Sequence, residues 1–187
     1  MLKYSQIINE ETGLVRVGIG SNTEYYQSIG MVERDIEQSD VDNNWYLKEK
    51  CPHKSDEEKL KEAKEAKYQE ANTKARRYLE SGEALFTFEK DENIYHIEAT
   101  DGNIAKIGLK ATALLMAGDT KTTFPWNTKE DINIQINALE GKFIAEGLGE
   151  VQDEVWTIKF PNYVNAINKA KTIKQVEAIE INYEGVN

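Results

Sequence analysis

The sequence predicts an α+β protein in which a long charged helix joins two modules of different composition. Short runs of strand-forming residues precede residue 52, charged residues dominate 53–82, and strand and helix patterns alternate over 83–187. We therefore expect a β-rich N-terminal docking module at 1–52, a charged linking helix at 53–82, and an α+β domain with a hairpin and helices at 83–187.

The first module shows strand and turn signals in close succession. Strand candidates lie at 4–8, 14–17, 31–36 and 45–47. The turn-forming residues 10–13 predict a hairpin between the first two, and 18–22 is expected to be a loop. A sheet this small has little core, so we expect the linking helix or a partner chain to cover its apolar face.

The linking helix has clear start and stop signals. Ser55 and Glu58 form a capping box, and Gly82 stands where glycine commonly ends a helix. Nine of the twelve residues from 56 to 67 are charged, which is typical of a solvated spacer or a strut. An apolar seam appears only in the second half, at Tyr68, Ala71, Ala75, Tyr78 and Leu79.

Two interpretations of this helix are open. In the first, the charged half of the helix faces solvent and is stabilised by i,i+4 pairs such as Glu70–Lys74. In the second, Leu60, Ala63 and Ala71 form a thin seam against copies of the same helix, and a homotrimer is one geometry that fits.

The third module begins with two apolar runs, 85–88 and 94–97, on either side of a polar tip, which predicts a hairpin. Asp101 is expected to cap a helix over 102–117. A loop is expected at 118–125, with a turn beginning at Trp126. Alternating isoleucines then predict a short strand within 128–136.

The last third of the chain has a helical pattern with one ambiguous stretch. Apolar residues step by four and three from Ile144 to Ile158, which predicts a helix broken near Pro161. The alternative is a strand over 156–160, because Trp156, Ile158 and Phe160 alternate with polar residues. Thr172 and Gln175 then suggest a capping box that opens a final short helix.

Charge and composition exclude several classes of function. The 187 residues carry a net charge of −10, so phosphate backbones should repel the chain, and we expect no nucleic-acid partner. No apolar run approaches the roughly 20 residues of a membrane span, and the N-terminus lacks a secretory signal. We expect a soluble protein made inside the cell. A single cysteine excludes an intrachain disulfide.

Motifs that carry chemistry are incomplete. Cys51-Pro52-His53 offers two zinc ligands, and no second pair completes a structural site. Residues 40–44 resemble the start of a calcium loop, yet Trp45 and Cys51 stand where glycine and glutamate are required. Residues 18–20 lack the third glycine of a phosphate-binding turn. We expect no catalytic residue, no cofactor, no metal and no enzymatic activity.

Aromatic and apolar residues are the better candidates for function, because tyrosine and tryptophan bury large rigid areas at protein interfaces. The candidate interface residues are Tyr25, Tyr26, Trp45, Leu60, Ala71, Tyr78, Phe124 and Trp126. For Trp45 and Trp126 the alternative is a place in a small core. For the two tyrosines, core and interface are both open.

Three stretches after residue 60 follow one another in a distinctive order: FTFEKDENIYHIEATDGNIAKIG, FPWNTKEDINIQINALEGKF and AINKAKTIKQVEAIEINY. Their marker residues are Phe86, Phe88, Asp101, Trp126, Thr128, Asp131, Ala170, Thr172, Val176 and Ile179. This order of motifs resembles an uncharacterised domain family of bacteriophage tail and tail-fibre proteins. Residues 155–161 depart from the family pattern, in which an uninterrupted helix is expected here. The opening residues 4–52 also look like the start of short tail-region proteins.

This resemblance implies a structural or assembly role in a contractile or related tail, a tailocin or a prophage, and it brings no catalytic residues. The first hypothesis is a structural protein of the tail fibre or baseplate that links other tail proteins in the virion. The alternative is a tail-fibre assembly chaperone that binds the fibre tip. An intracellular phage regulator is disfavoured by the acidic charge. The 118–128 segment is the candidate for contact with the host surface.

Overall fold

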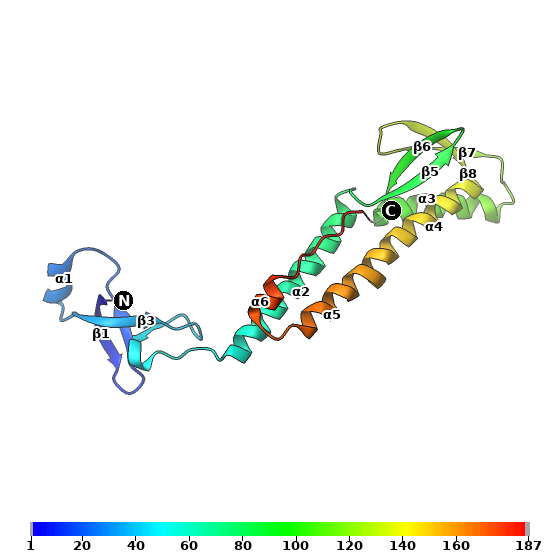
Figure 1. Ribbon diagram of the computed structural model, residues 1–187. Coiled ribbons are helices and arrows are strands. Elements are labelled where there is room, and N and C mark those ends of the chain that lie inside the picture. Colours follow the sequence, from blue (N-terminus) through cyan, green and yellow to red (C-terminus); the bar gives the residue numbers. More distant parts are fainter. Residues whose placement is uncertain (1, 186–187) are drawn as a thin grey trace. The chain divides into compact units, whose positions relative to one another are not determined.

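The computed structural model describes residues 2–185, and the chain divides into two compact units, 1–61 and 62–187 (Figure 1). The fold class is α+β, as predicted, with strands in both units and the long helices in the second. The division falls inside helix α2 (Asp56–Glu80), whose first residues belong to the first unit.

Four short strands of the first unit close into a small barrel in the order β1-β2-β4-β3. Their bounds are β1 Leu2–Asn9, β2 Leu14–Val17, β3 Val32–Gln38 and β4 Trp45–Leu47, so all four predicted strands are confirmed. Ser5 of β1 faces Val17 on one side and Val32 on the other, which brings the two ends of the sheet together. Because the barrel closes on itself, the unit covers its own small core of Val15, Met31 and Ile36.

The turns of the barrel follow the sequence signals, with one correction. Gly13 has a φ of +74° and donates its N–H to Asn9, which forms the predicted hairpin turn. The segment around Tyr25, predicted as loop, is instead a short helix, α1 (Thr23–Ser28). Asn22 caps it by accepting a hydrogen bond from the N–H of Tyr25 at 3.0 Å. A cap of this kind stabilises a helix too short to show a periodic pattern.

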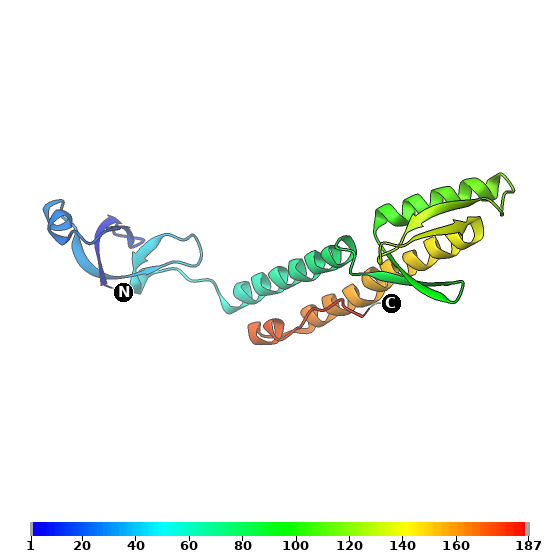
Figure 2. The same ribbon diagram turned by 90° about the horizontal axis from the view of Figure 1, so that it is seen from above.

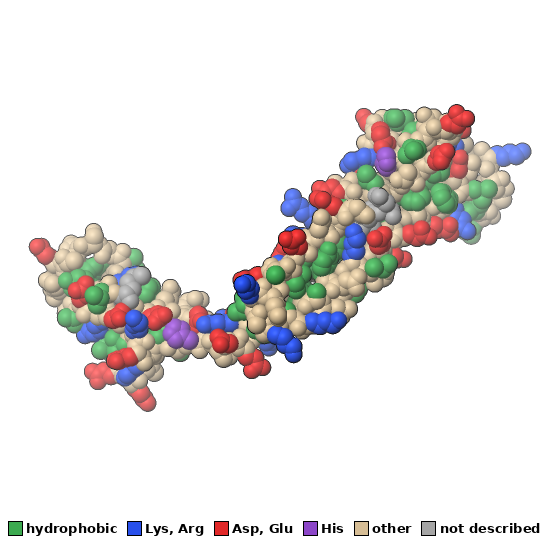
Figure 3. Space-filling view, viewed as in Figure 1, with side chains coloured by type: hydrophobic (Ala, Val, Ile, Leu, Met, Phe, Trp, Pro, Cys, Tyr) green, Lys and Arg blue, Asp and Glu red, His purple; other side chains and the backbone are tan. Residues whose placement is uncertain are grey.

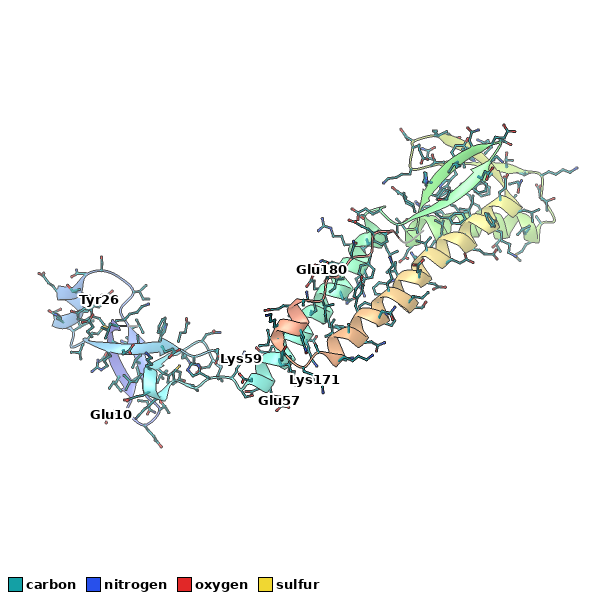
Figure 4. The ribbon with its side chains drawn as sticks, viewed as in Figure 1. Glu10, Tyr26, Glu57, Lys59, Lys171 and Glu180 are labelled. Carbon is teal, nitrogen blue, oxygen red and sulfur yellow. The ribbon has the colours of Figure 1, made fainter. Side chains whose placement is uncertain are left out.

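Helix α2 begins as predicted, after a short 3₁₀ turn, η1 (Lys48–Lys50). The N–H of Glu58 donates to the Ser55 hydroxyl at 3.2 Å, and the N–H of Ser55 donates to the Glu58 carboxylate at 2.8 Å. Asp40 accepts from the N–H of Lys54 at 2.7 Å and pairs with Lys59 at 2.9 Å in the first turns of the helix (Figure 4). The pKa of Asp40 falls to about 2, first because Lys59 hydrogen-bonds to it.

The second unit contains two hairpins and a set of long helices (Figure 2). The hairpins are β5 (Leu85–Lys90) with β6 (Asn93–Glu98), and β7 (Thr123–Asn127) with β8 (Asn133–Asn137). The helical elements after α2 are α3 (Asp101–Met116), α4 (Ala138–Asp153), the π-helical turn η2 (Glu154–Lys159), α5 (Phe160–Lys169) and α6 (Ile173–Glu177).

A continuous helical rod runs from α4 through η2 into α5, so the predicted break near Pro161 is wrong, and so is the alternative strand at 156–160. Pro161 has no N–H, and its ring would clash with a carbonyl of a regular α-helix. The wider π-helical turn lies directly before Pro161 and changes the hydrogen-bond register there. Val155 stays fully buried within this turn, so the apolar stripe continues through it.

The second half of α2 packs inside the second unit and is not a solvated strut. Its seam residues Ala71, Ala75, Tyr78 and Leu79 are buried. Tyr68 meets the ring of Phe160 in α5 at 5.5 Å, and the Tyr183 hydroxyl donates to the Ala71 carbonyl at 3.1 Å. The chain after α6 therefore runs along α2 (Figure 1). The predicted Glu70–Lys74 pair is present at 2.8 Å.

Two further expectations in this unit need correction. The predicted loop at 118–125 and the turn at Trp126 overlap strand β7, in which Phe124 lies opposite Ile136 and Trp126 lies opposite Ile134. Proline in β7 is compatible with the outer edge of a two-stranded ribbon, and it hid the strand from the sequence pattern. The cap of α3 is Thr100, which accepts from the N–H of Asn103 at 3.2 Å, in place of Asp101.

The final short helix is capped as expected by Thr172, which accepts from the N–H of Gln175 at 3.2 Å. The reciprocal bond of a capping box differs, because the Gln175 side chain accepts from the N–H of Lys171 at 2.7 Å. The hairpin predicted around residues 85–97 is confirmed, with Phe88 and Ile97 buried.

Glycine at position 147 allows β5 to lie against α4. A Cβ at Gly147 would overlap the ring of Phe86, whereas a Cβ at Gly149 would have no described neighbour within 4 Å. We expect Gly147→Ala to lower the free energy of unfolding by about 1–3 kcal/mol through overpacking. Gly149→Ala, the matched control on the same helix, should be neutral or stabilising by up to about 1 kcal/mol. Urea unfolding followed by circular dichroism measures both, and equal effects would contradict the assignment.

A hydrogen bond between the His96 ring and the Glu130 carboxylate joins β6 to the β7–β8 turn. Nδ1 of His96 lies 2.6 Å from Oε1 of Glu130, and this hydrogen bond lowers the pKa of Glu130 from 4.5 to about 2. The unfolded state therefore binds more protons in this range, so the contribution of Glu130 is complete above pH 4.5 and is lost as the pH falls toward 2.

We expect Glu130→Gln to flatten the dependence of the melting temperature on pH between 2 and 4.5. Glu89→Gln, at an exposed position of β5, serves as the control and should leave the slope unchanged. If Glu130→Gln has the same slope as the parent protein, the pair does not contribute.

Candidate interaction surfaces

The aromatic candidates of the first unit form local structure around α1. Tyr26 is half-buried, stacks on Tyr4 with ring centroids 6.0 Å apart, and accepts a hydrogen bond from the N–H of Gly20. Tyr25 packs against the edge of Tyr26 and remains 54% exposed (Figure 4 labels Tyr26). Of the two, Tyr25 is therefore the residue with area left for a partner.

Trp45 is half-buried at the edge of the barrel, where Nζ of Lys3 lies 4.4 Å from the centre of its ring. It pairs in register with Gln38 of β3. This position agrees with the alternative interpretation, in which Trp45 supports the small core of its own module.

The candidates on α2 divide between surface and core. Leu60 is half-buried, whereas Ala71 has no exposed area and Tyr78 is 6% exposed. Tyr78 stacks on Tyr183 with centroids 6.4 Å apart. Ala71 and Tyr78 are therefore occupied within the second unit, and the predicted self-association seam does not extend to Ala71.

Phe124 and Trp126 lie next to each other in β7 and differ in exposure. Phe124 is 7% exposed and contacts the position of Gly141, so it belongs to the core. Trp126 is half-buried, and its indole Nε1 is enclosed without an acceptor among residues 2–185. A buried donor left without a partner costs about 1–3 kcal/mol, so this side chain is held in place by the packing around it.

The largest exposed apolar side chains of the second unit gather on α3 and α4. Leu109 and Met116 are 75% and 85% exposed, and their spacing of seven places them on one side of α3. On α4, Leu139 and Phe143 are exposed by more than half, and the Phe143 ring also packs against Phe86 and Phe88 of β5. We call Leu109 and Met116, together with the groove between α3 and α4, the α3–α4 surface.

The groove of the α3–α4 surface has a volume of about 550 Å³. Small and apolar side chains form most of its wall, and Lys142 and Glu146 lie at its rim as an i,i+4 pair. Gly108 of α3 lies opposite Ala145 of α4, and a Cβ at position 108 would make an ordinary van der Waals contact with Ala145. Hydrophobic side chains also show on the face of the second unit drawn in Figure 3.

The sequence reasoning missed Leu109 and Met116, although a signal was present. The apolar spacing of α3 predicts a core stripe of Ile104, Ile107, Leu114 and Leu115. The structure places Ile107 in the core with Ile104 and Leu114 packed against it, whereas Leu115 lines the groove. Leu109 and Met116 fall on the opposite side of the same helix. A helix that is apolar on two sides needs two neighbours, and that signal is readable from the spacing.

A second concavity, of about 570 Å³, lies between the first half of α3 and the β7–β8 hairpin. We call it the Trp126 pocket. Its polar wall includes Lys106 and Lys110 of α3 and Asn127, Asp131 and Asn133 of the hairpin. Pro125 and Trp126 supply its apolar wall.

The incomplete chemical motifs are engaged in local structure. Asp42 accepts hydrogen bonds from Asn44 and from the Tyr46 hydroxyl, which lower its pKa to about 2. Burial and nearby carboxylates raise the pKa of the Cys51 thiol, so its nucleophilic thiolate is scarce. Among residues 2–185, no three His, Cys, Asp or Glu side chains are grouped to hold a metal ion. No helix in this range is both long and apolar enough to cross a membrane.

Comparison of the chain with models of protein families, with curated proteins and with solved structures gave no match. The interaction surfaces are therefore argued from the geometry of this chain alone.

Leu60→Lys tests the self-association seam without disturbing the core, and Ala71→Lys serves as the comparison that does disturb it. Leu60→Lys changes a half-buried position at the start of α2, and it should alter the free energy of unfolding by less than about 1 kcal/mol. Ala71→Lys places a charge in the core and should lower the free energy of unfolding by about 3–5 kcal/mol. Light scattering gives the mass of each variant. A shift toward monomer in Leu60→Lys would support the seam, and an unchanged mass would contradict it.

Proposed function

We propose that this protein is a structural component of a bacteriophage or phage-derived tail, at the tail fibre or baseplate, where it links other tail proteins. The order of motifs from Phe86 to Ile179, which resembles tail and tail-fibre proteins, supports the tail assignment. The acidic charge of −10 agrees with protein partners in preference to nucleic acid. The function needs no cofactor, because it works through shape and burial.

The observation that carries the adaptor role is the α3–α4 surface. Exposed apolar groups that cluster and are rimmed by charged groups mark sites of protein association. Here Met116 lines the groove and is 85% exposed, Leu109 lies on the same side of α3 and is 75% exposed, and Lys142 and Glu146 provide a polar rim. A tail protein that presents a complementary apolar ridge is the partner we propose for this surface.

The first unit supplies a second point of attachment in this proposal. Its barrel leaves Tyr25, Leu2 and Val32 exposed by more than half. A chain with apolar groups exposed on each of two compact units can hold two partners at once. Contact of the 118–128 segment with the host surface is a separate proposal. Residues Thr123–Asn127 of this segment form strand β7.

Quantitative mass spectrometry of washed tail particles tests the proposed role. A fixed number of copies per particle, in a small multiple of three or six, is expected for a structural component. Abundance in the lysate with absence from the particle would contradict it and would identify the assembly chaperone instead.

Substitution within the α3–α4 surface tests the adaptor role. Leu109→Lys with Met116→Lys should change the free energy of unfolding by no more than about 0.5 kcal/mol for each residue, because both side chains are exposed. Loss of a central apolar contact should reduce incorporation into particles by about ten-fold or more. Asn165→Lys, at an exposed position of α5, is the control. Normal incorporation of the double variant would show that this surface is not the attachment site.

A further inference from the structure

The Trp126 pocket contains two lysines whose charge is not balanced locally. Lys106 and Lys110 lie four residues apart on α3, and both line the pocket. Within residues 2–185 neither forms an ion pair, and Nζ of Lys110 lies 5.3 Å from the centre of the Phe124 ring. Like charges at this spacing repel each other. An anionic group placed between them would relieve that repulsion.

Neutral donors add to this excess. The Asn127 carbonyl oxygen accepts from the Asn133 amide at 2.8 Å, so the N–H groups of the Asn127 amide are left without an acceptor in the described chain. The Trp126 indole N–H also lacks an acceptor, but it is enclosed and therefore out of reach of a ligand. The Asn127 amide thus adds a neutral donor beside the two lysines, which favours a ligand with oxygen acceptors.

One acidic group in the pocket narrows the class of ligand. Asp131 lines the pocket from the β7–β8 turn, and its carboxylate receives no hydrogen bond from residues 2–185. Glu98 and Lys129, the other two charged residues that line the pocket, already pair with each other. Nζ of Lys129 donates to the Glu98 carboxylate at 2.9 Å and to the Gly82 carbonyl at 3.2 Å. A bare anion would be repelled by Asp131, whereas a ligand hydroxyl would donate to it. The ligand thus requires an anionic group and hydroxyl groups together.

The apolar wall supplies the last requirement. Pro125 and Trp126 offer flat apolar area beside the polar groups. A sugar ring has an apolar C–H face, and its hydroxyls donate and accept at its edge. We propose that the Trp126 pocket binds an acidic sugar unit of a saccharide, with its carboxylate or phosphate between Lys106 and Lys110 and a hydroxyl at Asp131.

Nuclear magnetic resonance of the full-length, ¹⁵N-labelled protein tests this directly. The chain has three tryptophans, so it has three indole N–H signals, and Trp126→Phe assigns the one of interest. Digalacturonate should move the Trp126 signal in a saturable manner at concentrations up to about 20 mM, the range of a weak site. The Trp45 and Trp156 signals should stay in place.

Matched variants identify the groups that bind. Lys106→Gln with Lys110→Gln should weaken binding by roughly ten-fold or more, because charge-assisted hydrogen bonds are lost. Lys121→Gln removes an exposed lysine outside the pocket and should bind like the parent protein. The remaining signals of each spectrum confirm that the variants are folded.

Several outcomes would overturn the proposal. They are an unmoved Trp126 signal, unchanged affinity in the double lysine variant, or equal shifts with lactose, with inorganic phosphate or with triglutamate. Equal binding of phosphate would indicate a simple anion site, and equal binding of triglutamate would indicate an acidic protein segment. This test uses the isolated protein, so its result is independent of whether the chain resides in a tail particle.

Discussion

The helical rod from Ala138 to Lys169 organises the second unit, because α3, both hairpins and the second half of α2 contact it. It is roughly 48 Å long at the rise of an α-helix. Toward its start it receives α3 and the β5–β6 hairpin, the latter through the close approach of Phe86 to Gly147. Toward its end Phe160 meets α2 and Tyr163 meets the last residues of the chain. Because the π-helical turn accommodates Pro161, one continuous rod contacts the elements at both of its ends.

The two proposed binding features share helix α3 and use different sides of it. Its inner side supplies Ile107 to the core, one outer side supplies Leu109 and Met116, and a third side supplies Lys106 and Lys110. A helix used on three sides has little freedom to vary in sequence. On a chain with a charge of −10, two lysines that form no ion pair within residues 2–185 line the same concavity as Glu98 and Asp131.

Local signals in the sequence predicted the elements that local chemistry determines. The capping box at Ser55 and the hairpin turn at Gly13 were readable, because each depends on residues within a few positions of each other. The continuation of the rod through Pro161 was not readable, because the energetic cost of a proline inside a helix depends on the tertiary structure around it. Strand β7 was hidden because Pro125 and Trp126 resemble a turn until the partner strand is known. Likewise, Ala71 and Phe124 are apolar residues whose burial depends on segments distant in sequence.

The segment after α6 has a consequence for the order in which the protein is made. Ile181 and Tyr183 are buried against α2, more than a hundred residues earlier in the chain. The ribosome must therefore synthesise these residues before the seam of α2 can be covered, whereas the barrel draws all its strands from the first fifty residues. During translation the first unit is able to fold and meet a partner while the second still exposes apolar surface. In the proposed adaptor role, attachment to a neighbour would thus begin at the N-terminal unit before the second unit has finished folding.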